Sequence, residues 1–190
     1  TIKKILKIAH RSFLGIILLL LALGIALSLP FVQTKIAQYF TQSINKDFGT
    51  NISIDEVSIS IFGGVKLKKV LILDHHKDTL IYVNRIKTNL LDGKKLLDGD
   101  LIFGGIGLDG MLLNLKTYKK ENETNIDVFI NAFDTGKPTG KHFLLTAINV
   151  KITNSNFILT DENRVIPKDV DFTKLNASIS DFKLYGPAVN

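Results

Sequence analysis

The sequence predicts a mainly β protein that is preceded by an N-terminal transmembrane helix and an amphipathic helix. A charge-free run fills residues 12–34, an apolar residue then recurs at every fourth position as far as Phe48, and apolar and polar residues alternate after Gly49. A period near 3.6 is typical of a helix, and a period of 2 is typical of a strand. The predicted parts are therefore a basic tail (1–11), an anchor (12–34), an amphipathic helix that caps the sheet (35–49) and a β region (50–190).

The apolar run reads FLGIILLLLALGIALSLPFV from Phe13 to Val32. A helix of about 20 residues rises about 30 Å, the thickness of the hydrocarbon core of a bilayer. A core helix of a soluble protein seldom lacks a polar face over this length, and the apolar part of a signal peptide usually has only about 7–15 residues. We therefore expect an uncleaved anchor. Its representative apolar residues are Phe13, Leu18, Leu21, Ile25 and Leu29.

The charges around this run predict its orientation. Four basic residues precede it, namely Lys3, Lys4, Lys7 and Arg11, and the first acidic residue is Asp47. Positive flanks stay in the cytoplasm. We therefore expect a single-pass protein with a cytoplasmic N-terminus and the bulk of the chain across the membrane.

Composition excludes several classes of function. The net charge is +6, but the excess lies in the first 46 residues, and the remainder carries 18 basic and 18 acidic residues. A nucleic-acid partner is therefore not expected, because such partners need a basic patch on the folded domain. The chain has no cysteine, so it has no disulfide framework and no thiolate metal ligand or nucleophile.

The apolar stripe after Pro30 predicts the amphipathic helix. It consists of Val32, Ile36, Phe40, Ile44 and Phe48. Gly49 stands where a C-cap glycine belongs, and Pro30 marks either a kink or the first turn of a separate helix. A stripe of this kind needs an apolar partner. The membrane surface is one candidate, and we expect the protein's own domain to supply it.

The β region predicts eight to ten short strands in an antiparallel meander with one apolar face. Turn residues separate the alternating segments at Gly63-Gly64, 74–78, Asp109-Gly110 and 154–156. The segment 127–133 fits either a short helix or a strand. A closed barrel, a two-sheet sandwich and a long curled sheet all satisfy this pattern.

Three motifs suggest chemistry, but each is better explained by a turn. Gly105–Gly110 spells GxGxxG, yet a strand-like segment follows it where a dinucleotide site requires a helix. His75 and His76 are adjacent, and neighbouring histidines in a strand point to opposite faces and rarely converge in a turn. Paired carboxylates such as Asp98 and Asp100 lie among turn residues. We therefore expect no metal site and no catalytic site, and a protein that is not an enzyme.

The order of several segments resembles a known family. An anchor leads into PFVQ (Pro30–Gln33), then a GxNIxI strand (Gly49–Ile54) and a hairpin that ends LxxVLILD (Leu67–Asp74). GDLIFGGIGLDGMLLNL (99–115) and NSNFILTDEN (154–163) continue the order. The whole chain is similar to the start of the AsmA-like/TamB family of diderm bacteria. The resemblance implies an inner-membrane anchor and a long periplasmic sheet that curls into an open hydrophobic groove (a β-taco).

The resemblance also implies a function. Such proteins are similar to bridge-like lipid-transfer proteins, and the family is associated with outer-membrane protein assembly. The expected partners are the inner membrane, phospholipids and an outer-membrane barrel of the BamA/TamA superfamily, reached through a C-terminal region beyond residue 190. No cofactor is implied other than a bound phospholipid. The pattern suggests Ile52, Ile54, Val57, Ile59, Ile61, Val65 and Leu67 as groove residues.

Two other functions fit the same sequence. The first is an envelope tether or assembly subunit that binds protein partners through its sheet. The second is an anchored enzyme whose catalytic domain lies further along the chain. The first of these is the principal alternative to a lipid conduit.

Overall fold

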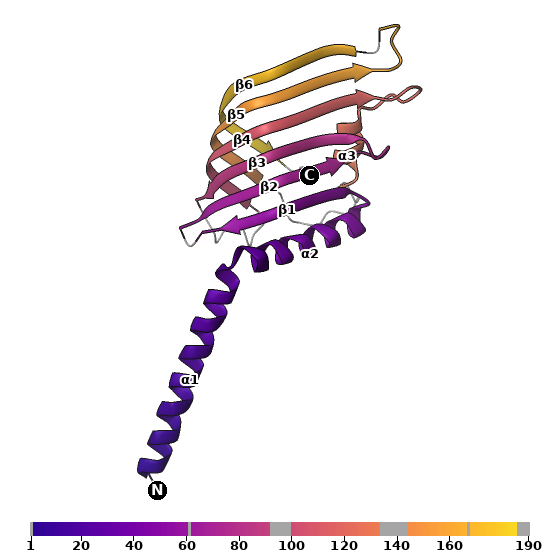
Figure 1. The fold of residues 1–190 in the computed structure, drawn as a ribbon. Helices are drawn as coiled ribbons and strands as arrows, with labels where there is room; N and C mark the ends of the chain where they lie inside the picture. Colours follow the sequence, from indigo (N-terminus) through magenta and orange to yellow (C-terminus); the bar gives the residue numbers. More distant parts are fainter. Residues whose placement is uncertain (1, 61, 92–99, 134–143, 167, 186–190) are drawn as a thin grey trace.

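The computed structural model describes residues 2–60, 62–91, 100–133, 144–166 and 168–185, and only the backbone of 2–14, 90, 100–101, 168–169 and 184–185. The protein is mainly β, with one mixed sheet of six strands (Figure 1). Within the described residues the first and last strands do not pair with each other, so the sheet is open. The elements are α1 (Ile2–Ser28), α2 (Pro30–Phe48), β1 (Asn51–Ile59), β2 (Gly64–Leu73), β3 (Thr79–Leu90), β4 (Asp100–Thr117), α3 (Asn125–Asn131), β5 (Leu144–Asp161) and β6 (Lys168–Tyr185).

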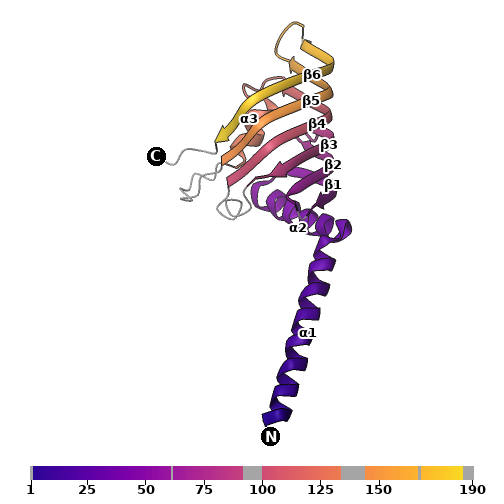
Figure 2. The ribbon, with the colours of Figure 1, turned by 90° about the vertical axis from the view of Figure 1, so that its left-hand side faces the viewer.

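Helices α1 and α2 meet at a bend of 72°, and α1 extends away from the sheet (Figure 2). Leu29 is extended between them, and Pro30 is the first residue of α2. Proline fits the first helical turn and disfavours helical backbone at the residue before it. Where side chains are described, no single helix is long and apolar enough to cross a membrane, whereas the bent pair Gly15–Ser28 and Pro30–Phe48 meets both criteria jointly.

Helix α2 lies along the edge of strand β1 (Figure 1). Four of its polar side chains bond the backbone of that edge: Gln33 to Ile59, Thr34 to Val57, Gln38 to Ile54 and Asn45 to Ile52. Free edge groups would otherwise pair with another chain. The helix therefore closes this edge with side chains in place of a further strand.

The apolar stripe of α2 is not the face that meets the sheet edge. Ile36 and Phe40 are exposed, while Ile44 and Phe48 are half-buried and the Phe48 ring lies 5.0 Å from that of Phe133. The expectation that the whole stripe packs on the protein's own domain therefore does not hold. The physical reason is that a strand edge presents N–H and C=O groups, which only polar side chains can satisfy.

Asn45→Ala should weaken this edge closure. The Asn45 amide donates to the Ile52 carbonyl and accepts from its N–H, each at 2.8 Å. Losing both bonds should lower the free energy of unfolding by about 2 kcal/mol. It should also speed hydrogen exchange at the Ile52 amide. Gln42→Ala, at an exposed position of the same helix, is the matched control, and equal exchange at Ile52 in the two variants would contradict the expectation.

The strands follow one another in chain order across the sheet, but their directions are not all antiparallel. Strands β4 and β5 run parallel, with Leu113 beside Phe157. The expected antiparallel meander is therefore wrong at this pair. The connection between the two strands contains α3. The ambiguous segment 127–133 is therefore helical as far as Asn131. Thr124 caps this helix in a capping box with Asp127.

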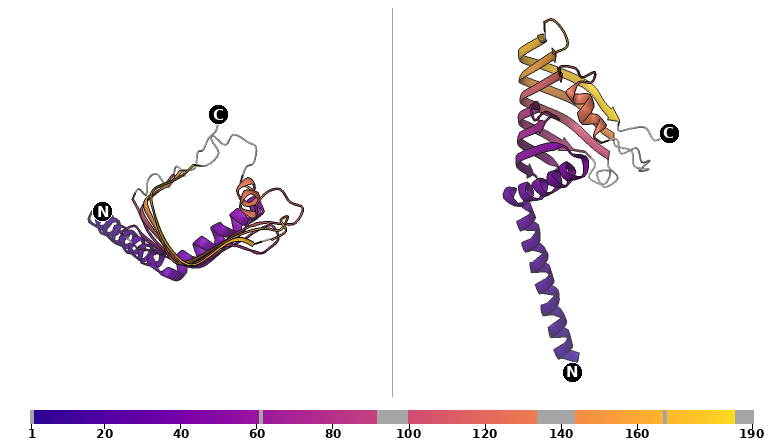
Figure 3. Two further views of the ribbon diagram at one scale, coloured as in Figure 1. Left: turned by 90° about the horizontal axis from the view of Figure 1, so that it is seen from above. Right: turned by 90° about the vertical axis from the view of Figure 1, so that its right-hand side faces the viewer.

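The sheet is sharply bent, as the view from above in Figure 3 shows. Left-handed residues lie at matching levels in four strands: Lys69 in β2, Gly110 in β4, Asn154 in β5 and Lys174 in β6. Asn84 of β3 lies between Lys69 and Gly110 in the register. A left-handed residue changes the direction of a strand without ending it. Together these residues form what we call the bend line.

The bend line explains why the strands are fewer and longer than expected. Asp109-Gly110 and Asn154–Asn156 were expected to be turns between strands, but they lie inside β4 and β5, each of 18 residues. Glycine and asparagine tolerate positive φ in a turn and in a strand alike. The glycine and asparagine residues therefore indicated where the backbone has a positive φ, but not whether it forms a turn between strands or a bend within one.

Gly110→Ala should destabilise the bend. Gly110 has a φ of +64°, and an added Cβ would lie 3.0 Å from the Asn84 Cβ. We expect a loss of about 1–2 kcal/mol in the free energy of unfolding, because alanine is strained at this φ and the contact is too close. Gly107→Ala is the control, since its Cβ would meet only the Lys87 carbonyl oxygen at 3.7 Å. Equal thermal midpoints in the two variants would contradict the prediction.

Candidate functional site

One face of the sheet carries aligned rows of apolar side chains, which we call the apolar face. Residues that pair across neighbouring strands share a face of the sheet. The registers give four rows: Ile52-Ile72-Ile81-Leu113-Phe157-Phe172, Ile54-Val70-Val83-Met111, Val57-Leu67-Ile86-Leu108-Ile152-Ala177 and Ile59-Val65-Thr88-Ile106-Val150-Ile179. Three of the rows span all six strands. The second row ends at Ser155, whose hydroxyl accepts from the Met111 N–H at 3.0 Å.

Most of the buried residues in the rows lie beside the bend line, and the exposed ones lie on the two outer strands. Val57, Val70, Val83 and Ser155 flank the bend line and are buried, and Val150 in the fourth row is buried as well. Ile59, Phe172 and Ile179, at the two outer strands, are 48%, 54% and 43% exposed. This apolar surface is therefore partly open to solvent within the described residues.

The groove residues suggested by the sequence lie together on this face. Ile52, Ile54, Val57 and Ile59 of β1 pair with Ile72, Val70, Leu67 and Val65 of β2. Ile61 lies outside the described residues. The suggested set covers only β1 and β2, whereas the rows continue across β3–β6. In every strand the apolar alternation shifts by one residue at the bend line. In β1 it runs from Ile54 to Val57, and in β3 from Val83 to Ile86.

The suggested anchor residues are exposed where they are described. Leu18, Leu21, Ile25 and Leu29 are each more than a third exposed on α1 or at its end. The side chains of Phe13, Lys3, Lys4, Lys7 and Arg11 lie outside the described residues. In the part of the chain described, the main contacts of α1 are with α2, next to the bend between the two helices.

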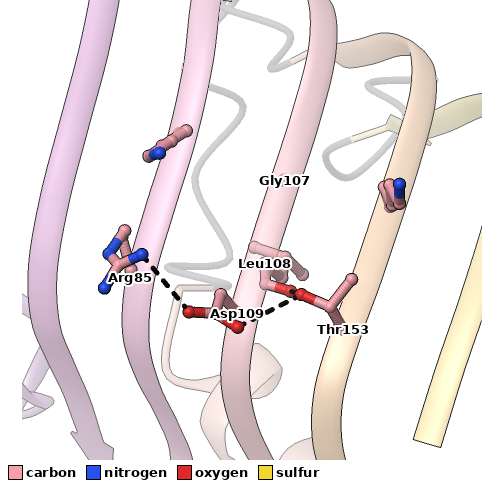
Figure 4. Close-up of a pocket in the computed structure, with 7 residues that line it drawn as sticks. Arg85, Gly107, Leu108, Asp109 and Thr153 are labelled. Atoms are coloured by element: carbon pink, nitrogen blue, oxygen red, sulfur yellow. Dashed lines mark hydrogen bonds and ion pairs between the residues drawn. The ribbon is translucent and has the colours of Figure 1, made fainter.

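The opposite face of the sheet, which we call the polar face, is charged and polar around Asp109, although Leu71, Tyr82 and Leu112 also lie on it. It holds a shallow pocket of about 320 Å³ (Figure 4). Arg85 lies 3.6 Å from Asp109, and the Thr153 hydroxyl donates to the other Asp109 oxygen at 3.2 Å. Lys87 and Lys151 complete the cationic part of the lining. The groups at its centre therefore pair with one another and do not converge on an open position for a ligand.

A buried polar cluster holds the strand ends beneath α3. Asn125 is fully buried and bonds both the Lys116 N–H and the Asn114 carbonyl of β4. Its amide also donates to Asp74 at 3.0 Å, and the Tyr118 hydroxyl donates to the same carboxylate oxygen at 2.7 Å. Burial and the hydrogen bonds to Asp74 raise the pKa of Tyr118 well above its usual value, so the hydroxyl stays a donor.

The Asp74 carboxyl should make stability depend on acid pH. Burial alone would raise its pKa, but hydrogen bonds from Asn125, Tyr118 and two backbone N–H groups outweigh burial and lower it. A lowered folded-state pKa gives stability that is present above the unfolded value near 3.9 and is lost as pH falls through the folded value. We expect thermal midpoints of the wild type to fall as the pH drops below about 4. Asp74→Asn should flatten this slope, and equal slopes in both proteins would contradict the assignment.

His75 and His76 converge, which the sequence analysis did not expect. Their Nε2 atoms lie 2.9 Å and 2.7 Å from the two carboxylate oxygens of Glu121. These hydrogen bonds, from His76 and then His75, lower the pKa of Glu121. No sequence pattern indicates this cluster, because Glu121 lies 46 and 45 positions from the two histidines and reaches them through the folding of β3 and β4.

Comparisons with known proteins add no relative: no family model, no curated protein and no solved structure matches this chain.

Proposed function

We propose that this protein is a non-enzymatic, inner-membrane-anchored conduit whose apolar face shelters lipid acyl chains. The observation that carries the proposal is the continuity of the apolar rows from β1, beside the helices, to β6 at the other side of the sheet. The order of segments, which resembles that of the AsmA-like/TamB family, supports the same proposal. On this proposal the bulk of the chain lies in the periplasm.

The burial pattern supports an apolar face that lines the inside of the bend. Four of the five buried residues of the rows flank the bend line, and Val150 is the exception, although no second sheet layer covers them within the described residues. Side chains that point into the angle of a bent sheet crowd one another, whereas those on the outside spread apart. The side chains of Asp55 and Lys69 at the bend line are accordingly about 60% exposed and form an ion pair with each other at 3.0 Å. The apolar face would then form an open groove.

The proposed groove supplies weak, repeated sites. Each methylene buried against aliphatic side chains contributes about 0.8 kcal/mol. Successive strands offer similar branched aliphatic groups, such as Val57, Leu67 and Ile86, so an acyl chain finds similar free energy at each step. Six strands at about 4.8 Å spacing give about 24 Å of path. Such a surface favours sliding over tight capture.

The helices supply the attachment in this proposal. The exposed apolar side chains of α1 suit a lipid environment, and the basic residues before them suit a cytoplasmic N-terminus. The 72° bend then turns α2 toward the membrane plane. Strand β1 would lie nearest the bilayer, and the rows would lead away from it.

Photo-crosslinking tests the proposal with matched positions on the two faces. A photoreactive residue at Leu67 or Ile86, on the apolar face, should give phospholipid adducts in membranes that contain the full chain. The same residue at Lys66 or Lys87, one position away on the polar face, should give none. Adducts are identified by mass spectrometry. Equal yields of phospholipid adducts on both faces, or no phospholipid adduct at any of the four positions, would contradict the proposal.

The edge of β6 favours a second candidate, a tether or assembly subunit. Strand β6 pairs with β5 on one side, and no described strand pairs with its other side. An exposed edge can add a strand from a partner protein. This function predicts protein adducts from crosslinkers along β6, at Thr173 or Ser178, with no phospholipid adducts at Leu67.

A further inference from the structure

Two turns at the same end of the sheet bring three potential metal ligands together. His75 and His76 lie in the turn between β2 and β3, and Glu121 lies in the turn after β4. The ligand atoms of these three side chains all lie within 4.8 Å of one another. We propose that they form a binding site for a divalent transition-metal ion, Zn²⁺ in particular. This site is separate from the apolar face and does not depend on the proposed lipid function.

Hydrogen bonds fix both turns, so the ligands are held in place before any ion binds. One Asp74 oxygen accepts from the N–H groups of His76 and Asp78 at 3.0 Å and 2.9 Å. Tyr118, at the start of the other turn, donates to both Asp74 and Asp78. The rigid placement of the two turns lowers the entropy cost of assembling a metal site.

The second turn is held from its other side by Asn163. Its amide donates to the carbonyls of Tyr118 and Glu121 at 3.3 Å and 2.9 Å, and its oxygen accepts from the Lys120 N–H at 2.7 Å. The backbone that carries Glu121 is therefore fixed to the region after β5. Together with Asp74, these contacts tie three connecting segments into one frame around the histidines.

The donor set and its exposure match zinc. Two imidazole nitrogens and one carboxylate oxygen are a common three-ligand set for Zn²⁺, with water at the fourth position. His75, His76 and Glu121 are 28%, 46% and 33% exposed at their side chains, so an ion and its water have access. Imidazole also binds Cu²⁺ and Ni²⁺ tightly, so these ions should compete in vitro.

The competing explanation is a hydrogen-bonded cluster that never binds an ion. In that case both histidines donate from Nε2 to Glu121 and the cluster serves only to join the two turns. The two explanations differ in a measurable way: a metal site needs deprotonated Nε2 lone pairs and gives a saturable stoichiometry, whereas the hydrogen-bonded cluster gives neither.

Titration of the full chain with ZnCl₂ tests the proposal. The protein is purified in detergent, any affinity tag is removed, and binding is followed by calorimetry at pH 7.5. We expect one Zn²⁺ per chain and a rise of several degrees in the thermal midpoint at saturating Zn²⁺. With Co²⁺ as the probe, visible absorption bands of a tetrahedral site should appear and should disappear when Zn²⁺ is added.

Variants separate this site from adventitious binding. Glu121→Gln should weaken Zn²⁺ binding at least tenfold, and the double variant His75→Ala/His76→Ala should abolish it. Glu123→Gln in the same connection and His142→Ala elsewhere in the chain are matched controls that should bind as the wild type does. Circular dichroism of each variant establishes that it is folded. No saturable binding below 1 mM Zn²⁺, or equal binding by wild type and the double variant, would overturn the proposal.

Discussion

Replacing Ile59 by aspartate should block the movement of lipid along the apolar face. Ile59 lies at the β1 end of a row that reaches Ile179 on β6. On the proposed path every acyl chain from the membrane passes this end first. A carboxylate must stay hydrated, and placing an unpaired one against an acyl chain costs several kcal/mol, which lowers occupancy by more than tenfold. Because Ile59 is already 48% exposed, the charge should leave the fold intact.

The decisive measurement is made far from the substitution. In the Ile59→Asp variant, a photoreactive residue at Ile152 on β5 should lose its phospholipid adducts, although four strand spacings separate the two positions. Ile179→Asp, at the other end of the row, should leave adducts at Leu67 unchanged. This asymmetry is expected for a path entered from the β1 side and is not expected for independent binding sites.

Neighbouring serines provide the controls. Ser58→Asp and Ser180→Asp introduce the same charge one position away, on the polar face, and should leave adducts at Ile152 unchanged. Membrane insertion of α1 should be the same in all four variants. Undiminished adducts at Ile152 in the Ile59→Asp variant would rule out entry from β1. Adducts lost equally in Ser58→Asp would point to a general structural effect.

Asn125→Ala should be among the most destabilising single substitutions in the chain. Asn125 is fully buried, and its side chain makes three hydrogen bonds, to the Lys116 N–H, the Asn114 carbonyl and Asp74. Alanine leaves these groups without their partner in a site that water reaches poorly. We expect a loss of about 3–5 kcal/mol in the free energy of unfolding.

Local and global readouts distinguish this effect from a general loss of helix. Thermal denaturation measures the total loss, and hydrogen exchange at the Lys116 amide reports the broken bond directly. Asn131→Ala, in the same short helix, is the matched control, because Asn131 is exposed and its side chain makes a single long hydrogen bond of 3.4 Å, to Glu123, among the described residues. We expect less than about 0.5 kcal/mol for the control. Comparable losses in the two variants would show that α3 as a whole, and not the buried amide, holds this end of the sheet.

The sequence predicted local features where neighbouring residues decide them. Pro30 ends one helix and begins the next because its ring restricts the backbone on both sides, and Gly49 ends α2 in the left-handed conformation that glycine favours. The alternation in β1 and β2 placed Ile52, Val57 and Leu67 on one face. These outcomes depend on a few consecutive residues and need no knowledge of distant contacts.

The predicted number of strands and the predicted direction of β5 relative to β4 were wrong, because a short stretch of sequence specifies neither. Gly110 and Asn154 have the conformational freedom of turn residues, and only pairing on both sides keeps β4 and β5 continuous through them. The parallel pairing of β4 with β5 depends on the path of the connection that contains α3. A pattern of period 2 reports which side chains share a face, not which strand lies beside it or in which direction that strand runs.

The amino-acid pattern was sufficient to predict that this protein is mainly β, that the helical segments before the sheet are kinked or separated at Pro30, and that β1 and β2 share an apolar face. Three further features depend on contacts between distant segments: the bend that runs through Gly110, the polar side of α2 on the β1 edge, and the meeting of His75 and His76 with Glu121. The physical reason is the range of the interactions involved. Helix and strand periodicity arises within a few residues, whereas an edge, a bend across several strands and a cluster built from two turns exist only after distant segments have paired.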